Sequence, residues 1–187
     1  MVQLYDVIRS GYDGNDRLQN QGYIKDNALS SHNQQVYFNP EKNDLIYNVT
    51  GSHNIKDWGT NLYLATGNLK KTNRFKEAHE GLRQAKQKYK VDGVTVTGDS
   101  LGGAIAGYVS SKKDKVVTLN KGSTIGQKVR GNEKAFRVSG DVVSLMNANS
   151  KHMKTLKNQN MATPFKAINA YHYAHVPSSI RKHNIKI

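Results

Sequence analysis

The chain has 187 residues, of which 36% are hydrophobic, and it carries 28 Lys and Arg against 14 Asp and Glu with no cysteine. This length predicts a single domain, 1–187, with a core of ordinary size, and the content of aromatic and β-branched residues excludes an intrinsically disordered chain. The lack of cysteine excludes disulfides, thiolate metal sites and a cysteine nucleophile.

The net charge of +14 is spread unevenly along the chain. No acidic residue follows Asp141, whereas seven basic residues do: Lys151, Lys154, Lys157, Lys166, Arg181, Lys182 and Lys186. Such a basic C-terminal face attracts polyanions, such as nucleic acid or an anionic phospholipid membrane surface, and it also keeps a protein in solution without any such partner. The charge indicates a class of partner and leaves the chemistry open.

Apolar runs long enough to enter a membrane do not occur in the sequence. Asp6, Arg9 and Asp13 interrupt the apolar positions near the N-terminus, so no signal peptide is evident, and no later run approaches a membrane span. We expect a soluble protein without a transmembrane segment. Its location stays open, with the cytoplasm and a viral particle among the candidates.

The N-terminal third predicts a helical or loop lead-in followed by a β-hairpin. The lead-in, 1–33, carries one apolar helical stripe before a turn at 11–16 that is rich in Gly, Asp and Asn. Short β-branched and aromatic runs at 35–38 and 44–50 then flank the turn sequence N-P-E-K-N. Two strands joined by such a turn form a hairpin.

A long amphipathic helix and a strand–turn–helix unit follow. Apolar residues recur at helical spacing over 73–89, and Thr72 or Asn73 is placed to cap this helix. After an Asp-Gly turn, V-T-V-T at 94–97 predicts a short strand, and the small-residue run 101–110 predicts a second helix.

The last third continues the alternation of strands and helices. The runs K-V-V-T-L at 115–119 and A-F-R-V at 135–138 predict strands, 142–152 predicts a helix, and 177–187 forms a basic C-terminal tail. This alternation is typical of an α/β fold with a mostly parallel β-sheet flanked by helices. We expect one compact domain of this class.

The strand at 94–97 and the helix after it meet in a glycine-rich turn, G-D-S-L-G-G, with Ser100 at its centre. A serine on such a turn is held in a strained conformation with its hydroxyl exposed, and the flanking glycines let neighbouring backbone pass closely. The following helix N-terminus favours a developing oxyanion. A glycine-rich helix start also binds phosphate or packs tightly, but the β-branched strand before it favours a nucleophile.

A serine nucleophile needs a histidine base and an acid that orients it, and in this kind of fold both follow the serine, the acid first. The later acids are Asp114, Glu133 and Asp141, of which Asp141 follows a predicted strand at its carboxyl end, where α/β sites form. Two histidines, His172 and His175, lie in a late loop, Y-H-Y-A-H-V-P. The residues alone leave the choice between them open.

Taken together, several landmarks resemble the class 3 lipases of the α/β-hydrolase fold. In chain order they are V-T-G-S at 49–52, D-W at 57–58, the N-R pair that opens the helix at 73–89, V-T-V-T-G-D-S-L-G-G at 94–103, and the acid stretch at 136–143. They cover roughly 34–176 in ordered patches, and the combination is far more specific than any one motif. The chain resembles a compact variant of this family with a G-D-S-L-G-G nucleophile turn.

This resemblance implies a Ser-His-Asp catalytic triad and an oxyanion hole. The residues that match the family's motifs are Ser100 as nucleophile, Asp141 as the orienting acid, His175 as the base, and Ser52 and Leu101 as backbone N–H donors of the oxyanion hole. His172 remains the alternative base. The implied chemistry needs no metal and no other cofactor.

Three departures from the family pattern distinguish this chain. Asp99 stands where the family has a histidine before the nucleophile, and we expect its carboxylate to point into solvent. The strand before Gly51 lacks the family's arginine. Only 59–71 separate the D-W pair from the amphipathic helix, which predicts a missing or reduced lid.

The sequence therefore predicts a serine hydrolase, lipase- or phospholipase-like, that cleaves carboxylic esters of lipids, with an anionic phospholipid surface as a candidate partner. A thioesterase or a peptidase on the same fold would use the same residues. The alternative is a non-catalytic module of hydrolase fold that binds nucleic acid or another polyanion through its basic C-terminal face. The triad residues in their correct chain order favour the hydrolase.

Overall fold

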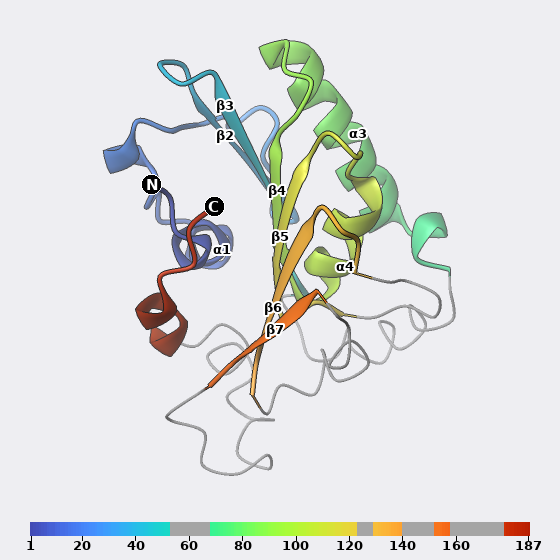
Figure 1. Cartoon of the computed structure of the whole chain (residues 1–187). Coiled ribbons are helices and arrows are strands. Elements are labelled where there is room, and N and C mark those ends of the chain that lie inside the picture. The colour runs from blue at the N-terminus through green and yellow to red at the C-terminus, as the bar shows by residue number, and fades with distance from the viewer. Residues whose placement is uncertain (53–67, 123–128, 140–151, 158–177) are drawn as a thin grey trace.

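A mixed β-sheet runs through the centre of the molecule, with helices on both of its faces (Figure 1). The computed structural model describes residues 1–52, 68–122, 129–139, 152–157 and 178–187. Within them the strands, in their order across the sheet, are β1 (Ile24–Lys25), β2 (Gln34–Asn39), β3 (Asp44–Val49), β4 (Thr95–Asp99), β5 (Lys115–Leu119), β6 (Glu133–Val138) and β7 (Met153–Leu156). The α-helices are α1 (Leu4–Asp13), α3 (Asn73–Tyr89) and α4 (Ser100–Val109), and short 3-10 helices lie at Gln19–Gln21, Leu69–Lys71 and Ser178–His183.

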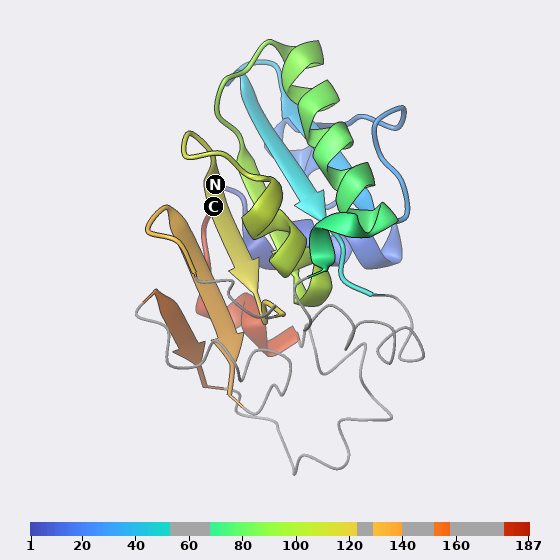
Figure 2. The same cartoon turned by 90° about the vertical axis from the view of Figure 1, so that its right-hand side faces the viewer.

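Strand direction divides the sheet into two parts. The strands β1, β2 and β3 pair antiparallel, whereas all pairs from β3 to β7 are parallel. Parallel neighbours need crossover connections, and α3 and α4 lie in two of them on one face of the sheet. Helix α1 and the C-terminal segment, residues 178–187, cover the other face (Figure 1, Figure 2). The carboxyl ends of β3 to β7 consequently meet at one edge of the sheet.

Apolar side chains fill both layers between the sheet and its helices. Beneath α3 and α4, one buried cluster includes Leu82, Val96 and Ile105. On the opposite face Ile8 of α1 and Ile180 of the C-terminal segment belong to a second cluster. Because helices cover both faces, the central strands β3, β4 and β5 are buried along their whole length except at the first residue of each.

Most of the elements predicted from the sequence are confirmed. The hairpin is β2–β3, and the helix predicted over 73–89 is α3. Its cap is Thr72, whose hydroxyl accepts a hydrogen bond of 3.2 Å from the Phe75 N–H. The strands β4, β5 and β6 and the helix α4 lie within two residues of their predicted bounds.

Helix α1 and the two outer strands differ from the expectation. The helix continues through the first residues of the predicted turn and ends at Gly14, whose φ is 71°. Gly11 lets this part of the helix pack closely on β2, because a Cβ at that position would lie 2.6 Å from the side-chain oxygen of Gln35. The strands β1 and β7 carry weak sequence signals: β1 has two residues, and in β7 only Leu156 is buried.

Two predictions fall largely outside the described residues. Of the helix predicted over 142–152, only His152 is described, and it lies in a turn directly before β7. Of the segment predicted as a reduced lid, 59–71, only 68–71 are described, and most of these form the short 3-10 helix at Leu69–Lys71.

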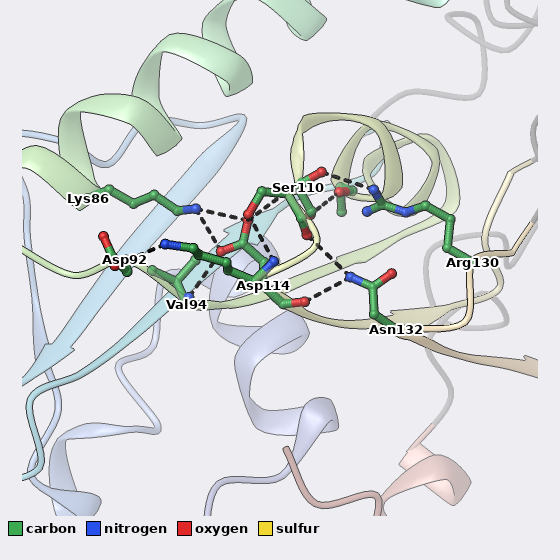
Figure 3. Close-up of polar contacts among 10 residues, drawn as sticks. Lys86, Asp92, Val94, Ser110, Asp114, Arg130 and Asn132 are labelled. Carbon is green, nitrogen blue, oxygen red and sulfur yellow. Dashed lines mark hydrogen bonds and ion pairs between the residues drawn. The ribbon is translucent and has the colours of Figure 1, made fainter.

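A buried carboxylate fastens the elements together at the amino-terminal edge of the parallel strands (Figure 3). Asp114, just before β5, forms an ion pair of 2.7 Å with Lys86 of α3 and accepts hydrogen bonds from the N–H groups of Val94 and Ser111. Burial alone would raise the pKa of this carboxyl, but these hydrogen bonds outweigh burial and lower the pKa. Asn132 extends the network by donating to the Asp114 carbonyl at 3.0 Å.

Candidate active site

Ser100 lies at the sharp turn where β4 passes into α4. Its φ of 51° is left-handed, a conformation that costs a non-glycine residue about 1–2 kcal/mol, while Asp99 before it is still extended. This is the strand–turn–helix context predicted for the G-x-S-x-G sequence. The expectation of an exposed serine is wrong, because Ser100 is 4% exposed.

The glycines of the motif let the turn approach neighbouring backbone. A Cβ on Gly102 would lie 2.1 Å from the Val49 carbonyl oxygen at the end of β3, and a Cβ on Gly98 would lie 2.6 Å from the Gly102 carbonyl oxygen. No real side chain fits at such distances. The first turn of α4 can therefore pack directly against the ends of β3 and β4, which fixes the position of Ser100 between them.

The loop after β5 braces the turn from the other side. The Gly122 N–H donates a hydrogen bond of 2.8 Å to the Ser100 carbonyl. Beside it, the buried Lys121 ammonium donates to both carboxylate oxygens of Glu133, at 2.7 and 2.8 Å, and Thr118 donates to the same carboxylate. Burial lowers the pKa of Lys121, and the Glu133 carboxylate opposes that shift. This ion pair holds the loop to the start of β6, while the Gly122 hydrogen bond holds it to α4.

Asp99 points into the protein interior, which corrects the expectation that it faces solvent. The residue is fully buried. One carboxylate oxygen accepts a hydrogen bond of 2.6 Å from the Tyr12 hydroxyl of α1, and the other accepts one of 3.2 Å from the Gly51 N–H. Its position at the carboxyl end of a central strand, beneath α1, explains this burial. Asp99 thus connects α1, the end of β4 and the segment after β3.

Ser52 and Leu101 both lie at the carboxyl-terminal edge of the parallel strands. Val49 pairs with Gly98 in the β3–β4 register, so Ser52, three residues beyond β3's end, and Leu101, in the first turn of α4, both follow adjacent strand ends. Ser52 is 6% exposed. Arg74 of α3 donates to the Thr50 carbonyl and holds the segment that carries Ser52. Backbone N–H groups at a helix N-terminus stabilise negative charge placed beside them.

The remaining triad candidates, Asp141, His172 and His175, lie outside the described residues. The two other acids that follow Ser100 are both engaged elsewhere: Asp114 holds the amino-terminal edge of the sheet, and Glu133 pairs with a buried lysine. In the described part of the chain, no group of three or more His, Cys, Asp or Glu side chains could hold a metal ion. No helix in that part is long and apolar enough to cross a membrane.

Sequence reasoning missed the residues that support the turn from a distance. Tyr12 is separated from Asp99 by 87 residues, and nothing in the local sequence joins them. The pair of Lys121 and Glu133 leaves one weak signal, a lysine two residues beyond the end of an apolar strand. The β5–β6 register pairs Glu133 with Val116, so Lys121 meets this carboxylate only because its side chain reaches it from the loop after β5.

Solved structures with a similar backbone include lipases. A fungal lipase in complex with an inhibitor aligns with a TM-score of 0.51 at 14% identity, over 76% of this chain and 71% of that one. The Rhizomucor miehei lipase propeptide complex gives a TM-score of 0.45 at 12% identity over 72% and 58%, and the Lip2 lipase from Yarrowia lipolytica gives 0.37 at 17% over 72% and 65%. The chain thus spans 58 to 71% of the length of these lipases.

Comparison of sequences alone identifies no relative. No family model matches the chain, and no curated protein matches it. At 14% identity the structural similarity establishes the fold, which is that of the lipase-like α/β-hydrolases. The predicted fold class, a mostly parallel sheet flanked by helices in an α/β-hydrolase-like arrangement, is confirmed.

Proposed function

We propose that the protein is a serine hydrolase that cleaves carboxylic esters of lipids by acyl transfer. The observation that carries this proposal is the left-handed φ of 51° at Ser100, between a strand end and the N-terminus of a ten-residue helix. A left-handed serine has no benefit for packing, since glycine would adopt the same backbone without strain. Strain retained at such a turn is typical of a nucleophile.

The reaction would proceed through an acyl-enzyme. The Ser100 hydroxyl attacks the ester carbonyl while His175, with His172 as the alternative, takes its proton; the resulting oxyanion lies against the N–H groups of Ser52 and Leu101. The protonated histidine then gives its proton to the leaving alcohol. Water, deprotonated by the same histidine, releases the acyl group as a carboxylic acid and restores the serine.

Asp141 is the acid that this mechanism requires beside the histidine. Three acids follow Ser100 in the chain, and two of them are bound to lysines in buried networks that serve the fold. If Glu133 paired with a histidine instead, Lys121 would be left as an unpaired buried cation, and if Asp114 did so, the partly buried Lys86 would lose its partner. The exclusion of Asp114 and Glu133 supports Asp141.

A lipid ester is the proposed substrate class, and an anionic phospholipid surface is the proposed site of action. The fold-level similarity to lipases supports the first. The net charge of +14 supports the second, because an anionic surface concentrates a basic protein where its substrate lies. Phospholipase activity is accordingly proposed together with lipase activity.

Labelling with a fluorophosphonate probe, followed by peptide mapping, tests the nucleophile. The probe reacts with activated serines, so we expect modification of Ser100 in the wild type and none in Ser100→Ala. Ser110→Ala is the matched control, because Ser110 is a buried serine at the other end of α4 with an ordinary φ of −73°. Labelling should be run with and without lipid vesicles, since Ser100 is nearly inaccessible in the structure.

The outcomes separate the hydrolase from its alternative. Labelling of Ser100 that survives Ser110→Ala supports an activated nucleophile, and loss of labelling in His175→Ala or in His172→Ala then identifies the base. If Ser100 stays unmodified under both conditions, the hydrolase proposal is wrong. A non-catalytic module that binds polyanions through its basic face would then replace it.

A further inference from the structure

A groove of about 670 Å³ lies beside the outermost strand of the sheet, far in sequence from the nucleophile turn. It opens between β6, β7 and the C-terminal segment. The described residues that line it are Lys134, Phe136, Lys154, Thr155, Leu156, Lys157, Lys182, His183, Asn184, Ile185 and Lys186. Five of them are lysines and none is acidic, so the wall of the groove is strongly cationic.

Three separate parts of the chain bring these lysines together. Lys134 belongs to β6, Lys154 to β7, and Lys182 to the C-terminal segment, and all five lysines are exposed. In the described part of the chain, none of the five forms an ion pair. Like charges at this density repel one another, and a bound anion would remove that repulsion.

The wall formed by the C-terminal segment is fixed to the rest of the fold. The Leu4 N–H donates to the Ile185 carbonyl at 2.9 Å, and the Ile187 N–H donates to the Val2 carbonyl at 3.0 Å. His183 lies 3.1 Å from the Lys157 carbonyl and connects this wall to the end of β7. The lysines therefore extend from an ordered scaffold and not from a free tail.

The floor of the groove is apolar. Leu156 and Ile185 are buried in the cluster beneath α1, and Phe136 packs against it. A cationic rim above an apolar floor fits an amphiphile, whose phosphate meets the ammonium groups while its glycerol and upper acyl carbons cover the floor. Single-stranded nucleic acid would instead use several large aromatic faces or arginines for stacking, and the lining holds one phenyl ring, one imidazole and no arginine.

We propose that this groove docks the protein on membranes by binding the headgroup of an anionic phospholipid. The proposal deepens the proposed function and rests on it for the lipid nature of the partner. Lys157 directly follows the carboxyl end of β7, and Ser100 follows that of β4 at the same edge of the sheet. Across the sheet, three strand spacings, about 14 Å, separate β7 from β4. A membrane held at the groove therefore lies close to the catalytic edge.

Vesicle sedimentation tests the groove without any turnover. The probes are vesicles of phosphatidylcholine alone and vesicles of phosphatidylcholine and phosphatidylglycerol in equal parts. The groove variant combines Lys154→Gln, Lys157→Gln and Lys182→Gln. The control combines Lys71→Gln, Lys76→Gln and Lys112→Gln, which removes the same charge from exposed lysines in and around α3 and α4, on the opposite face.

The groove variant should lose affinity for the anionic vesicles by on the order of a hundred-fold, since each lysine near an anionic surface contributes roughly five-fold. The control should lose no more than a few-fold. Equal losses in both variants would overturn the proposal in favour of general charge attraction. It would also be overturned if the groove variant lost binding to a single-stranded oligonucleotide while keeping its vesicle affinity.

The proposed function and the groove can fail separately. Vesicle binding by the Ser100→Ala protein tests the groove whether or not the serine is a nucleophile. Fluorophosphonate labelling of the groove variant without vesicles tests the serine whether or not the groove binds lipid. A protein that labels normally yet binds both kinds of vesicle equally would be a hydrolase without this docking groove.

Discussion

Two buried aspartates stand at opposite edges of the parallel sheet, and they are held in different ways. Asp114, at the amino-terminal edge, is paired with the Lys86 ammonium. Asp99, at the carboxyl-terminal edge, accepts hydrogen bonds from the neutral Tyr12 hydroxyl and the Gly51 N–H. The first arrangement fastens α3 and β4 to β5, whereas the second fixes the segment next to a strained serine.

This difference shows how an α/β sheet divides its tasks. At the amino-terminal edge the chain satisfies its polar groups with an ion pair and backbone caps, which serves stability. At the carboxyl-terminal edge it keeps a left-handed serine and a carboxylate beside it, which costs stability and is typical of sites in this fold class. Substitutions at the two edges should consequently affect stability and labelling in different proportions.

The largest expected effect on stability is at Asp114. Asp114→Ala leaves Lys86 without its partner and removes the acceptor for the Val94 and Ser111 N–H groups, so the free energy of unfolding in urea should fall by about 3 kcal/mol. Asp92→Ala is the control, because its ion pair with Lys113 is exposed and should contribute less than about 1 kcal/mol. Folded Asp114→Ala protein should still label at Ser100. If Asp114→Ala lost labelling while its stability stayed unchanged, the amino-terminal edge would not serve stability alone, and the proposed division between the two edges would be wrong.

Tyr12→Phe should combine a smaller loss of stability with a loss of reactivity. Removing the hydroxyl takes a hydrogen bond of 2.6 Å from the buried Asp99 carboxylate, which costs about 2 kcal/mol. Asp99 then restrains Gly51 and the neighbouring Ser52 less well, so labelling of Ser100 should slow about tenfold. Tyr5→Phe, on the same helix, is the control. If the labelling rates of Tyr12→Phe and Tyr5→Phe change only in proportion to their losses of stability, Asp99 has only a structural role.

The sequence predicted the central fold because its signals are local. The helical spacing over 73–89, the apolar run of β5 and the G-x-S-x-G turn each form within a short window, and all three are found where they were expected. The support of the site was not predictable in this way. The burial of Asp99 depends on Tyr12, which reaches it only because Gly11 lets α1 pack closely on β2 and β3. Such a contact between distant segments leaves no periodic pattern.

Ser100→Gly should make the protein more stable, by about 1 kcal/mol, while abolishing its labelling. Glycine adopts a φ of 51° without strain, although its greater freedom in the unfolded chain offsets part of the gain. Ser100→Ala keeps the strain and should lose labelling without gaining stability. Thermal unfolding of both variants distinguishes them. A stability of Ser100→Gly equal to that of Ser100→Ala would mean that the turn stores no strain.

The smallest expected effect is the contribution of Asp114 to the pH dependence of stability. Hydrogen bonds lower the pKa of Asp114 below its ordinary value of 3.8, so this carboxylate contributes stability above that pH, and the contribution is lost as the pH falls through the lowered pKa. Urea unfolding from neutral pH downwards should show wild type and Asp114→Asn converging in stability only in strong acid. Because Asn keeps the volume but never ionises, its curve should be flatter across this range. Parallel curves would mean that Asp114 titrates alike in the folded and unfolded chains, and that its ion pair does not distinguish the two edges.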